Sequence, residues 1–176
     1  MIFGEFDFDQ IFREIDVHTP LVVMMCGVAG SGKTTFSKRL EREGFVRLSI
    51  DEEIRKTHGR YGIDYPMEKI EEYKEEAESK LRNLLIQLLS EKQQVVIDFS
   101  FWQRARRDEY KQLIEETGGK WKLIYLKVYP DELRERLKIR NKRMDANAYP
   151  VTDDLLNNYL NGFETPAGEG EIVVKN

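Results

Sequence analysis

One stretch decides the fold of this chain: residues 21–35 read LVVMMCGVAGSGKTT. Its first part, Leu21 to Cys26, is an uninterrupted apolar run, which is typical of a strand buried on both faces. Residues Gly27 to Thr34 then match the pattern G-x-x-x-x-G-K-[ST] in full. A helical pattern runs from Lys33 to Glu43 and stops at Gly44. A strand, a glycine-rich loop and a helix in this order predict a phosphate-binding loop.

The residue types in this loop suit a nucleoside triphosphate. Glycines let the backbone approach phosphate oxygens with N–H groups pointing inward, and the following helix N-terminus adds partial positive charge. In this pattern Lys33 reaches the β- and γ-phosphates, and the Thr34 hydroxyl ligates Mg²⁺. We therefore expect ATP and Mg²⁺ as cofactors. The residues expected to bind the nucleotide are Gly27, Ala29, Gly30, Ser31, Gly32, Lys33, Thr34 and Thr35.

The rest of the chain alternates short apolar runs with helical patterns, which predicts an α/β fold with a mainly parallel sheet. Further strands are expected at 45–50, 95–98, 122–129 and 172–174, and further helices at 67–93, 103–117, 131–144 and 152–159. No repeat or Pro/Gly/Ser-rich linker divides the sequence, so we expect a single domain over residues 1–176, with residues 1–20 as an N-terminal extension. The side chains expected to pack this extension against the domain are Phe6, Phe8, Ile11, Phe12 and Ile15.

Charge and composition argue against several classes of protein. The net charge of −4 gives no basic field that would draw the whole protein to nucleic acid or an anionic membrane. Cys26 is the single cysteine, so no internal disulfide can form. No apolar run approaches the ~20 residues that span a bilayer, and the first residues do not resemble a secretory signal. We expect a soluble, cytoplasmic protein with no membrane partner.

The remaining motifs favour a kinase over a GTPase. A guanine-reading N-K-x-D pattern is missing, because Met144 stands where the aspartate of Asn141–Met144 would be. Asp98 is followed by Phe99-Ser100-Phe101, so it does not begin a D-x-x-G switch. A small ATP-dependent kinase is the class that remains.

Two aspartates are expected at the carboxyl ends of strands, where ligands bind in open α/β sheets. Asp51 follows the apolar run that ends at Ile50, and Asp98 closes the run Val95–Ile97. A carboxylate in this place can take a proton from a substrate hydroxyl or hold Mg²⁺ through water. We expect Asp51 to be the general base and Asp98 to bind the metal, with both close to the substrate. The alternatives are an N-cap role for Asp51 and a structural turn role for Asp98.

A basic helix is expected between Arg134 and Arg143, with six basic residues. At about 100° per residue, Arg136, Arg140 and Arg143 share one face, next to leucines that should face the core. We expect Arg136 and Arg140 to neutralise charge on the transferring phosphoryl group, with residues 141–150 as a small lid. The alternative is a solvated charged helix.

Further candidates follow the two aspartates. Arg55 lies one helical turn after Asp51, and Trp102, Arg104 and Arg107 follow Asp98. The arginines are expected to hold an anionic substrate and Trp102 to stack on a flat one. For Arg104 and Arg107, surface pairing with Asp108 and Glu109 is an equally weighted alternative. For Trp102, core packing is an equally weighted alternative.

Five segments together resemble the zeta-toxin and chloramphenicol-phosphotransferase type of P-loop kinase, and also the 5′-kinase domain of polynucleotide kinases. They are Gly27–Thr34, Ser49–Arg55, Val95–Asp98, Glu135–Leu137 and Arg140–Asn141. The resemblance covers about residues 21–174 and implies three layers, with helices on both faces of a sheet of order 2-3-1-4-5 and a helical lid. It also implies that Asp51 activates the acceptor hydroxyl. Arg55 lies four residues after Asp51, whereas the polynucleotide enzymes place their arginine three residues after, which disfavours that branch.

These expectations combine into one hypothesis of function: transfer of the γ-phosphoryl group of ATP to a hydroxyl of a small-molecule acceptor. One alternative is a polynucleotide 5′-hydroxyl kinase, with nucleic acid as the partner. The other is a regulatory module that binds the nucleotide without turnover. The sequence leaves the identity of the acceptor and the oligomeric state open.

Overall fold

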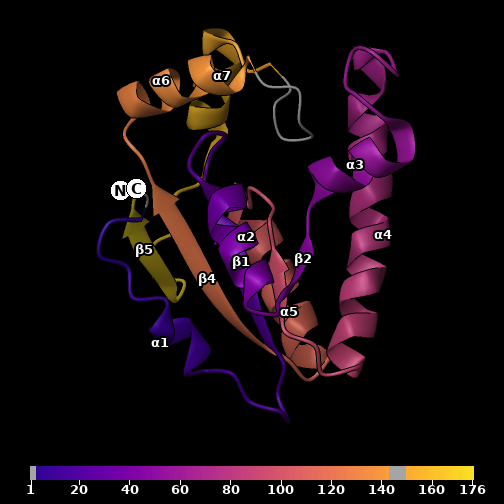
Figure 1. The fold of residues 1–176 in the computed structure, drawn as a ribbon, viewed down its shortest axis with the longest axis vertical. Coiled ribbons are helices and arrows are strands. Elements are labelled where there is room, and N and C mark those ends of the chain that lie inside the picture. Colours follow the sequence, from indigo (N-terminus) through magenta and orange to yellow (C-terminus); the bar gives the residue numbers. More distant parts are fainter. Residues whose placement is uncertain (1–2, 143–149) are drawn as a thin grey trace.

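The computed structural model describes residues 3–142 and 150–176, and its centre is a five-stranded sheet (Figure 1). The strands are β1 (Leu21–Cys26), β2 (Val46–Leu48), β3 (Val95–Ile97), β4 (Lys120–Lys127) and β5 (Glu171–Lys175). They lie in the order β2-β3-β1-β4-β5, and every pairing between them is parallel. The expected fold class and strand order are confirmed, and the sheet is parallel throughout the described residues.

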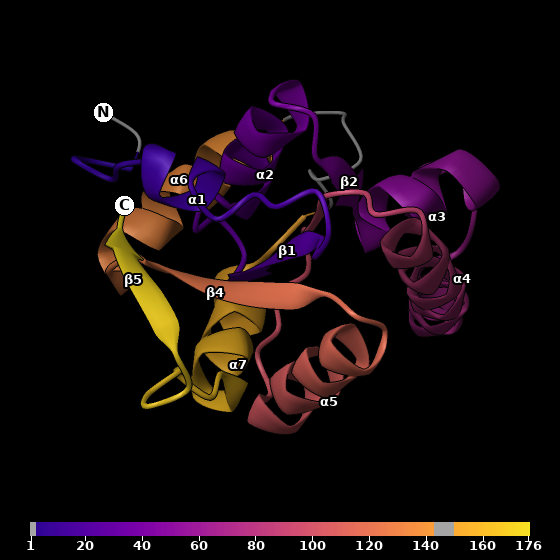
Figure 2. The same ribbon diagram turned by 90° about the horizontal axis from the view of Figure 1, so that it is seen from below.

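Helices cover both faces of this sheet, which makes three layers (Figure 2). The helices are α1 (Asp9–Phe12), α2 (Lys33–Arg42), α3 (Ile50–His58), α4 (Ile70–Ser90), α5 (Arg104–Glu116), α6 (Pro130–Arg140) and α7 (Asp153–Gly162), with a 3₁₀ turn at Met67–Lys69. One face carries α1 and α2, the other carries α5, and α3 and α4 lie at the β2 edge. In Figure 1, α6 and α7 lie beyond the carboxyl ends of the strands.

The central strand β1 supplies both halves of the core, because its successive side chains point to opposite faces. Val22, Met24 and Cys26 pack in a cluster with buried side chains of α4 and α5. Val23 and Met25 pack on the other face with α2 and the N-terminal extension. All six residues of β1 are buried, as its continuous apolar run predicts.

Several element boundaries differ from those expected. β2 stops at Leu48, because the Ser49 side chain accepts a hydrogen bond from the Glu52 N–H and starts α3 at Ile50. The helix expected over 67–93 is a 3₁₀ turn followed by α4, and it ends at Ser90. By contrast, Thr152 caps α7 as its sequence predicts, accepting from the Leu155 N–H.

The N-terminal extension packs on the α2 side of the sheet. Phe8 and Ile11 are buried, and Phe6 and Phe12 pack partly buried against the same cluster, as expected. Ile15 is 41% exposed, so its predicted packing is wrong. None of the helices in the described residues is apolar over a length that would cross a membrane.

Candidate active site

The phosphate-binding loop lies between β1 and α2, at the carboxyl edge of the sheet. Gly32 precedes α2 with a φ of +99°, and Gly30 has a φ of +83°, conformations in which a side chain would be strained. A Cβ on Gly30 would also lie 3.3 Å from Leu137, because α6 packs closely against the loop. The glycines therefore permit both the turn and the approach of α6.

The residues of the loop fit a bound phosphate chain. The first N–H groups of α2 have no acceptors within the helix and point toward the loop, so they are free to bind an anion. A Cβ on Gly27 would lie 2.5 Å from the Ser31 Oγ, which shows how tightly the loop is wound. The buried Ser31 hydroxyl has no hydrogen-bond partner among the described residues, so it is an orphaned polar atom inside the loop. These features support the predicted roles of Gly27, Gly30, Ser31 and Gly32 in nucleotide binding.

Lys33 folds back over the loop, where its Nζ donates a 3.0 Å hydrogen bond to the Val28 carbonyl. Burial lowers the pKa of Lys33, and the nearby carboxylates of Asp98 and Asp51 oppose that change. The ammonium group is therefore held beside the loop, where the charges of both carboxylates act on it. Ala29 packs partly buried against the α6–α7 cluster, and Thr35 is exposed.

Thr34 and Asp98 come together at the edge of β3. Thr34 Oγ1 donates to Asp98 Oδ2 at 3.0 Å, and the Asp98 carboxylate is 3% exposed. A hydroxyl and a carboxylate are the oxygen ligands that Mg²⁺ prefers, and Mg²⁺ commonly completes its shell with water and phosphate oxygens. The pair thus fits the predicted metal site.

Arg47 is a site residue that the sequence reasoning missed. Its Nε and Nη2 donate to the same Asp98 oxygen at 3.0 and 2.7 Å, from a side chain that is 6% exposed. Its Nη1 also lies 3.7 Å from Glu52 Oε1. A charged residue that interrupts the apolar run of β2 was the available signal, because a buried arginine requires a buried carboxylate.

Asp51 lies in the first turn of α3 and does not cap it. Ser49 is the N-cap, so the capping alternative for Asp51 is wrong. No hydrogen bond to the Asp51 carboxylate occurs among residues 3–142 and 150–176. Burial raises the pKa of Asp51, while the charges of Arg140 and Lys33 oppose the rise and that of Asp98 adds to it. A carboxylate with a raised pKa and no fixed donor is suited to accept a proton.

Two arginines of α6 act on the loop and on Asp51. Arg136 Nη1 donates to the Gly30 carbonyl at 3.4 Å, and its Nη2 pairs with Glu132. The charge of Arg140 acts on both Lys33 and Asp51 and lowers the pKa of each. Leu133 and Leu137 are buried, as the helical pattern predicts. Arg143 and most of the predicted lid lie outside the described residues.

The candidates on α5 have other surroundings. Arg107 is fully buried and forms a bidentate ion pair with Glu169, so neither a substrate contact nor a surface pair describes it. Arg104 is exposed, with its Nε 3.6 Å from Asp108, as the surface alternative predicts. Trp102 is 46% exposed and stays a candidate for stacking. Arg55 is partly buried on α3, and its charge acts on Asp64.

Solved structures with the same fold include several kinases. A candidate kinase from Chloroflexus aurantiacus aligns with a TM-score of 0.70 at 19% identity, covering 89% of this chain and 88% of that one. A chain of the Pnkp1/Rnl/Hen1 RNA repair complex aligns with a TM-score of 0.67 at 20% identity, covering 85% of this chain and 46% of that one. A gluconokinase from Sinorhizobium meliloti aligns with a TM-score of 0.56 at 23% identity, covering 90% and 83%. At these identities the likeness shows the shared fold.

The sequence itself gives a more specific result. No curated protein matches the chain. A model of the AAA domain family, a family of P-loop NTPases, matches residues 22–166, which include the whole phosphate-binding loop, Asp51, Asp98 and α6. The chain therefore belongs to the AAA domain family of P-loop NTPases.

Proposed function

We propose that the protein is an ATP-dependent phosphotransferase that moves the γ-phosphoryl group of ATP to a hydroxyl of a small-molecule acceptor. The observation that carries the proposal is the position of Asp51. Its carboxylate accepts no hydrogen bond from the described residues, has a raised pKa, and lies within the electrostatic reach of Lys33 and Arg140. A module that only binds nucleotide has no need of such a base beside the phosphate loop.

Each residue then has a defined part in the transfer. Asp51 takes the proton of the acceptor hydroxyl while the acceptor oxygen forms a bond to the γ-phosphorus. The bond between the γ-phosphorus and the oxygen that bridges to the β-phosphate breaks, and ADP leaves. Lys33, Arg136 and Arg140 hold positive charge around the phosphoryl oxygens as negative charge shifts toward the leaving group. Thr34 and Asp98 would hold Mg²⁺, which supplies further charge neutralisation when bound.

The test is a screen of acceptors with ATP and Mg²⁺, in which mass spectrometry detects a gain of one phosphoryl group. The panel combines sugars, nucleosides and hydroxylated antibiotics with an RNA oligonucleotide that carries a 5′-hydroxyl. Lys33→Ala is the control, because the β- and γ-phosphates then lose a directed positive charge. Phosphorylation of a small molecule by the wild type alone is the expected result. Phosphorylation of the oligonucleotide alone would favour the polynucleotide kinase, and ATP binding with no product from any acceptor would favour the regulatory module.

A further inference from the structure

The turn that follows β3 connects the metal carboxylate to the phosphate loop. Asp98 begins this turn, with its N–H donating to the Leu48 carbonyl at 2.8 Å. Two residues later, the Ser100 carbonyl accepts a 3.1 Å hydrogen bond from the N–H of Gly27, the first residue of the phosphate loop. The conformation of this turn therefore sets the position of Asp98 and of Gly27 together.

The same turn contains a strained residue. Phe101 has a φ of +46°, in the left-handed region that residues other than glycine seldom adopt. Such conformations persist only where the surroundings over-determine them. The Phe101 ring packs at 5.5 Å from Phe99 and 5.1 Å from Tyr110, between ring centroids, which fixes the side chain. Hydrogen bonds to the Phe101 carbonyl are needed to fix the backbone as well.

Two buried donors converge on that carbonyl. Arg107 Nη1 donates to the Phe101 oxygen at 2.8 Å, and the Cys26 thiol donates to it at 3.4 Å. Burial raises the pKa of Cys26 to about 12, so this thiol keeps its proton and remains a donor at neutral pH. Arg107 makes the shorter of the two contacts, and it carries the charge.

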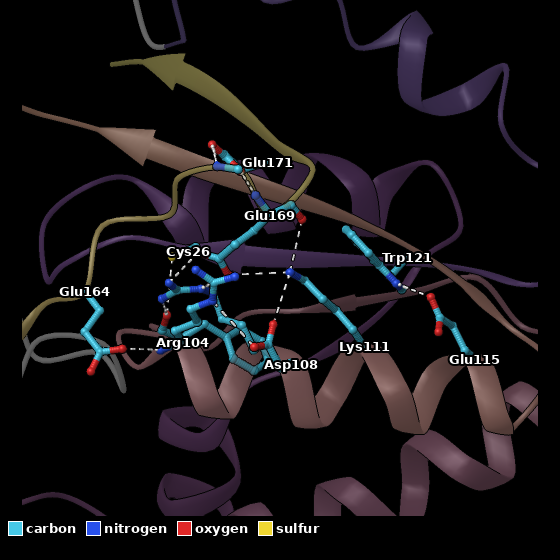
Figure 3. A network of polar contacts seen from close by, with 12 residues as sticks. Cys26, Arg104, Asp108, Lys111, Glu115, Trp121, Glu164, Glu169 and Glu171 are labelled. Carbon is cyan, nitrogen blue, oxygen red and sulfur yellow. Dashed lines mark hydrogen bonds and ion pairs between the residues drawn. The ribbon is translucent and has the colours of Figure 1, made fainter.

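Arg107 is itself oriented by Glu169, in the segment that leads into β5. Its Nε and Nη2 donate to the two Glu169 oxygens at 2.9 and 2.8 Å, and the two side chains are 0% and 2% exposed. Lys111 Nζ donates to the Glu169 backbone carbonyl at 3.1 Å, and the Glu171 carboxylate accepts from the Glu169 N–H at 2.8 Å (Figure 3). Hydrogen bonds from Arg107 lower the pKa of Glu169, which therefore stays ionised. A planar guanidinium fixed at two nitrogens aims its third nitrogen at Phe101.

We infer that Arg107 is a positioning residue for the nucleotide and metal site, acting through the Phe101 carbonyl on the turn that carries Asp98 and binds Gly27. A buried ion pair is a weak source of stability, because desolvation offsets its attraction, so stability alone does not explain it. The fork geometry of the guanidinium explains the presence of Arg107 better, since a lysine ammonium has no rigid planar fork that would match both Glu169 oxygens and aim another donor at Phe101. The inference rests on the proposed binding of ATP and Mg²⁺ at this site.

The test is ATP affinity, measured by calorimetry as a function of Mg²⁺ concentration, in Arg107→Lys and Glu169→Gln. Outer-shell partners of metal ligands are typically worth about 10–100-fold in metal affinity. Arg107 bonds no metal ligand directly, so we expect the Mg²⁺ concentration for half-maximal ATP affinity to rise by about tenfold, the lower end of that range, in both variants. Glu169→Gln keeps the size of the side chain, so it decides the question if Arg107→Lys does not fold.

Two controls separate positioning from general loss of stability. Arg82→Lys changes an arginine of a surface pair with Glu109, and Leu89→Ala destabilises the core at the far end of α4. Both should leave the Mg²⁺ dependence within twofold of the wild type. A lower melting temperature in Arg107→Lys and Glu169→Gln with an unchanged Mg²⁺ dependence would overturn this inference and leave the proposed function standing. A wild type that binds no ATP would overturn the proposed function as well.

Discussion

Thr34 Oγ1 lies 3.0 Å from Asp98 Oδ2, although 64 residues separate them in the chain. Thr34 lies in the first turn of α2, the helix after β1, and Asp98 directly follows β3, the neighbour of β1 in the sheet. Parallel pairing of these two strands is therefore what brings a hydroxyl and a carboxylate to one point beside the phosphate loop.

This pair predicts the response of the protein to Mg²⁺. Thr34→Ala removes an oxygen ligand, so the Mg²⁺ concentration needed for half-maximal ATP turnover should rise, whereas Thr34→Ser keeps the hydroxyl and should stay near the wild type. The measurement is a Mg²⁺ titration of turnover at saturating ATP. Superimposable curves for the wild type and Thr34→Ala would show that Thr34 is not a metal ligand.

Arg47 and Asp98 form a buried ion pair, so the loss of one partner alone should destabilise the β2 edge. Arg47→Met leaves the Asp98 carboxylate buried without its main counter-charge, which typically costs about 3–5 kcal/mol. Adding Asp98→Asn removes that charge, so the double variant should be more stable than Arg47→Met alone. Urea denaturation of the two single variants and the double variant measures the coupling. Additive losses would mean that the pair is not coupled.

The two faces of α6 should differ in their effect on catalysis. Arg136 touches the loop at Gly30, and the charge of Arg140 acts on Lys33 and Asp51, whereas Lys138 is exposed and pairs with Glu135. Arg136→Ala and Arg140→Ala should lower kcat more than they raise the KM for ATP, because their charge acts mainly in the transition state. A single arginine finger is worth on the order of 10³–10⁵ in rate, and one arginine among several should cost less.

Lys138→Ala is the matched control on the same helix, and it should be nearly silent. Steady-state kinetics of the three variants with one acceptor preparation gives the comparison. Equal losses of kcat in Lys138→Ala and Arg140→Ala would refute the assignment of these faces.

The raised pKa of Asp51 predicts a stability effect with a definite sign. Above the ordinary Asp value and below the raised pKa, the folded protein binds more protons than the unfolded chain, so stability falls as pH rises through that window. The ionised carboxylate is then destabilising at neutral pH. Asp51→Asn should melt at or above the wild-type temperature at neutral pH, with the difference shrinking toward about pH 4.

Asp154→Asn is the control for this effect, because Asp154 lies in the first turn of α7, where a negative charge stabilises the helix. That variant should melt at or below the wild-type temperature. Calorimetric scans across the pH range decide the matter, and an Asp51→Asn variant less stable than the wild type at every pH would contradict a raised pKa.

The fold could be predicted from the sequence because its signals are local. The apolar run of β1 and the glycine pattern after it lie within 15 consecutive residues, and the structure begins and ends β1 where the run does. The end of β2 could not be predicted from the apolar run alone. Ile50 continues an apolar run, but the Ser49 hydroxyl caps a helix there, so Ile50 faces the core from α3.

The parts of the site that could not be predicted depend on partners that are far away in the sequence. Arg107 stands in a run of charged residues on a helix, and nothing local shows that Glu169, 62 residues later, will enclose it. Arg47 meets Asp98 across 51 residues, through the pairing of β2 with β3. Spacing identifies residues that share one loop or one helix face, whereas the pairing of buried charges follows from the assembled sheet.

The central claim is that Asp51 removes the proton of the acceptor hydroxyl. Asp51→Asn keeps the shape of the side chain but cannot accept that proton, and general-base assistance is typically worth about 10²–10⁴ in rate. The decisive measurement is the rate of acceptor phosphorylation, taken with the ATP Kd on the same Asp51→Asn preparation. We predict that kcat falls by about 10² or more while the ATP Kd barely changes. A rate of phosphorylation close to that of the wild type would contradict the account, and Asp98 would then be the next candidate for the base.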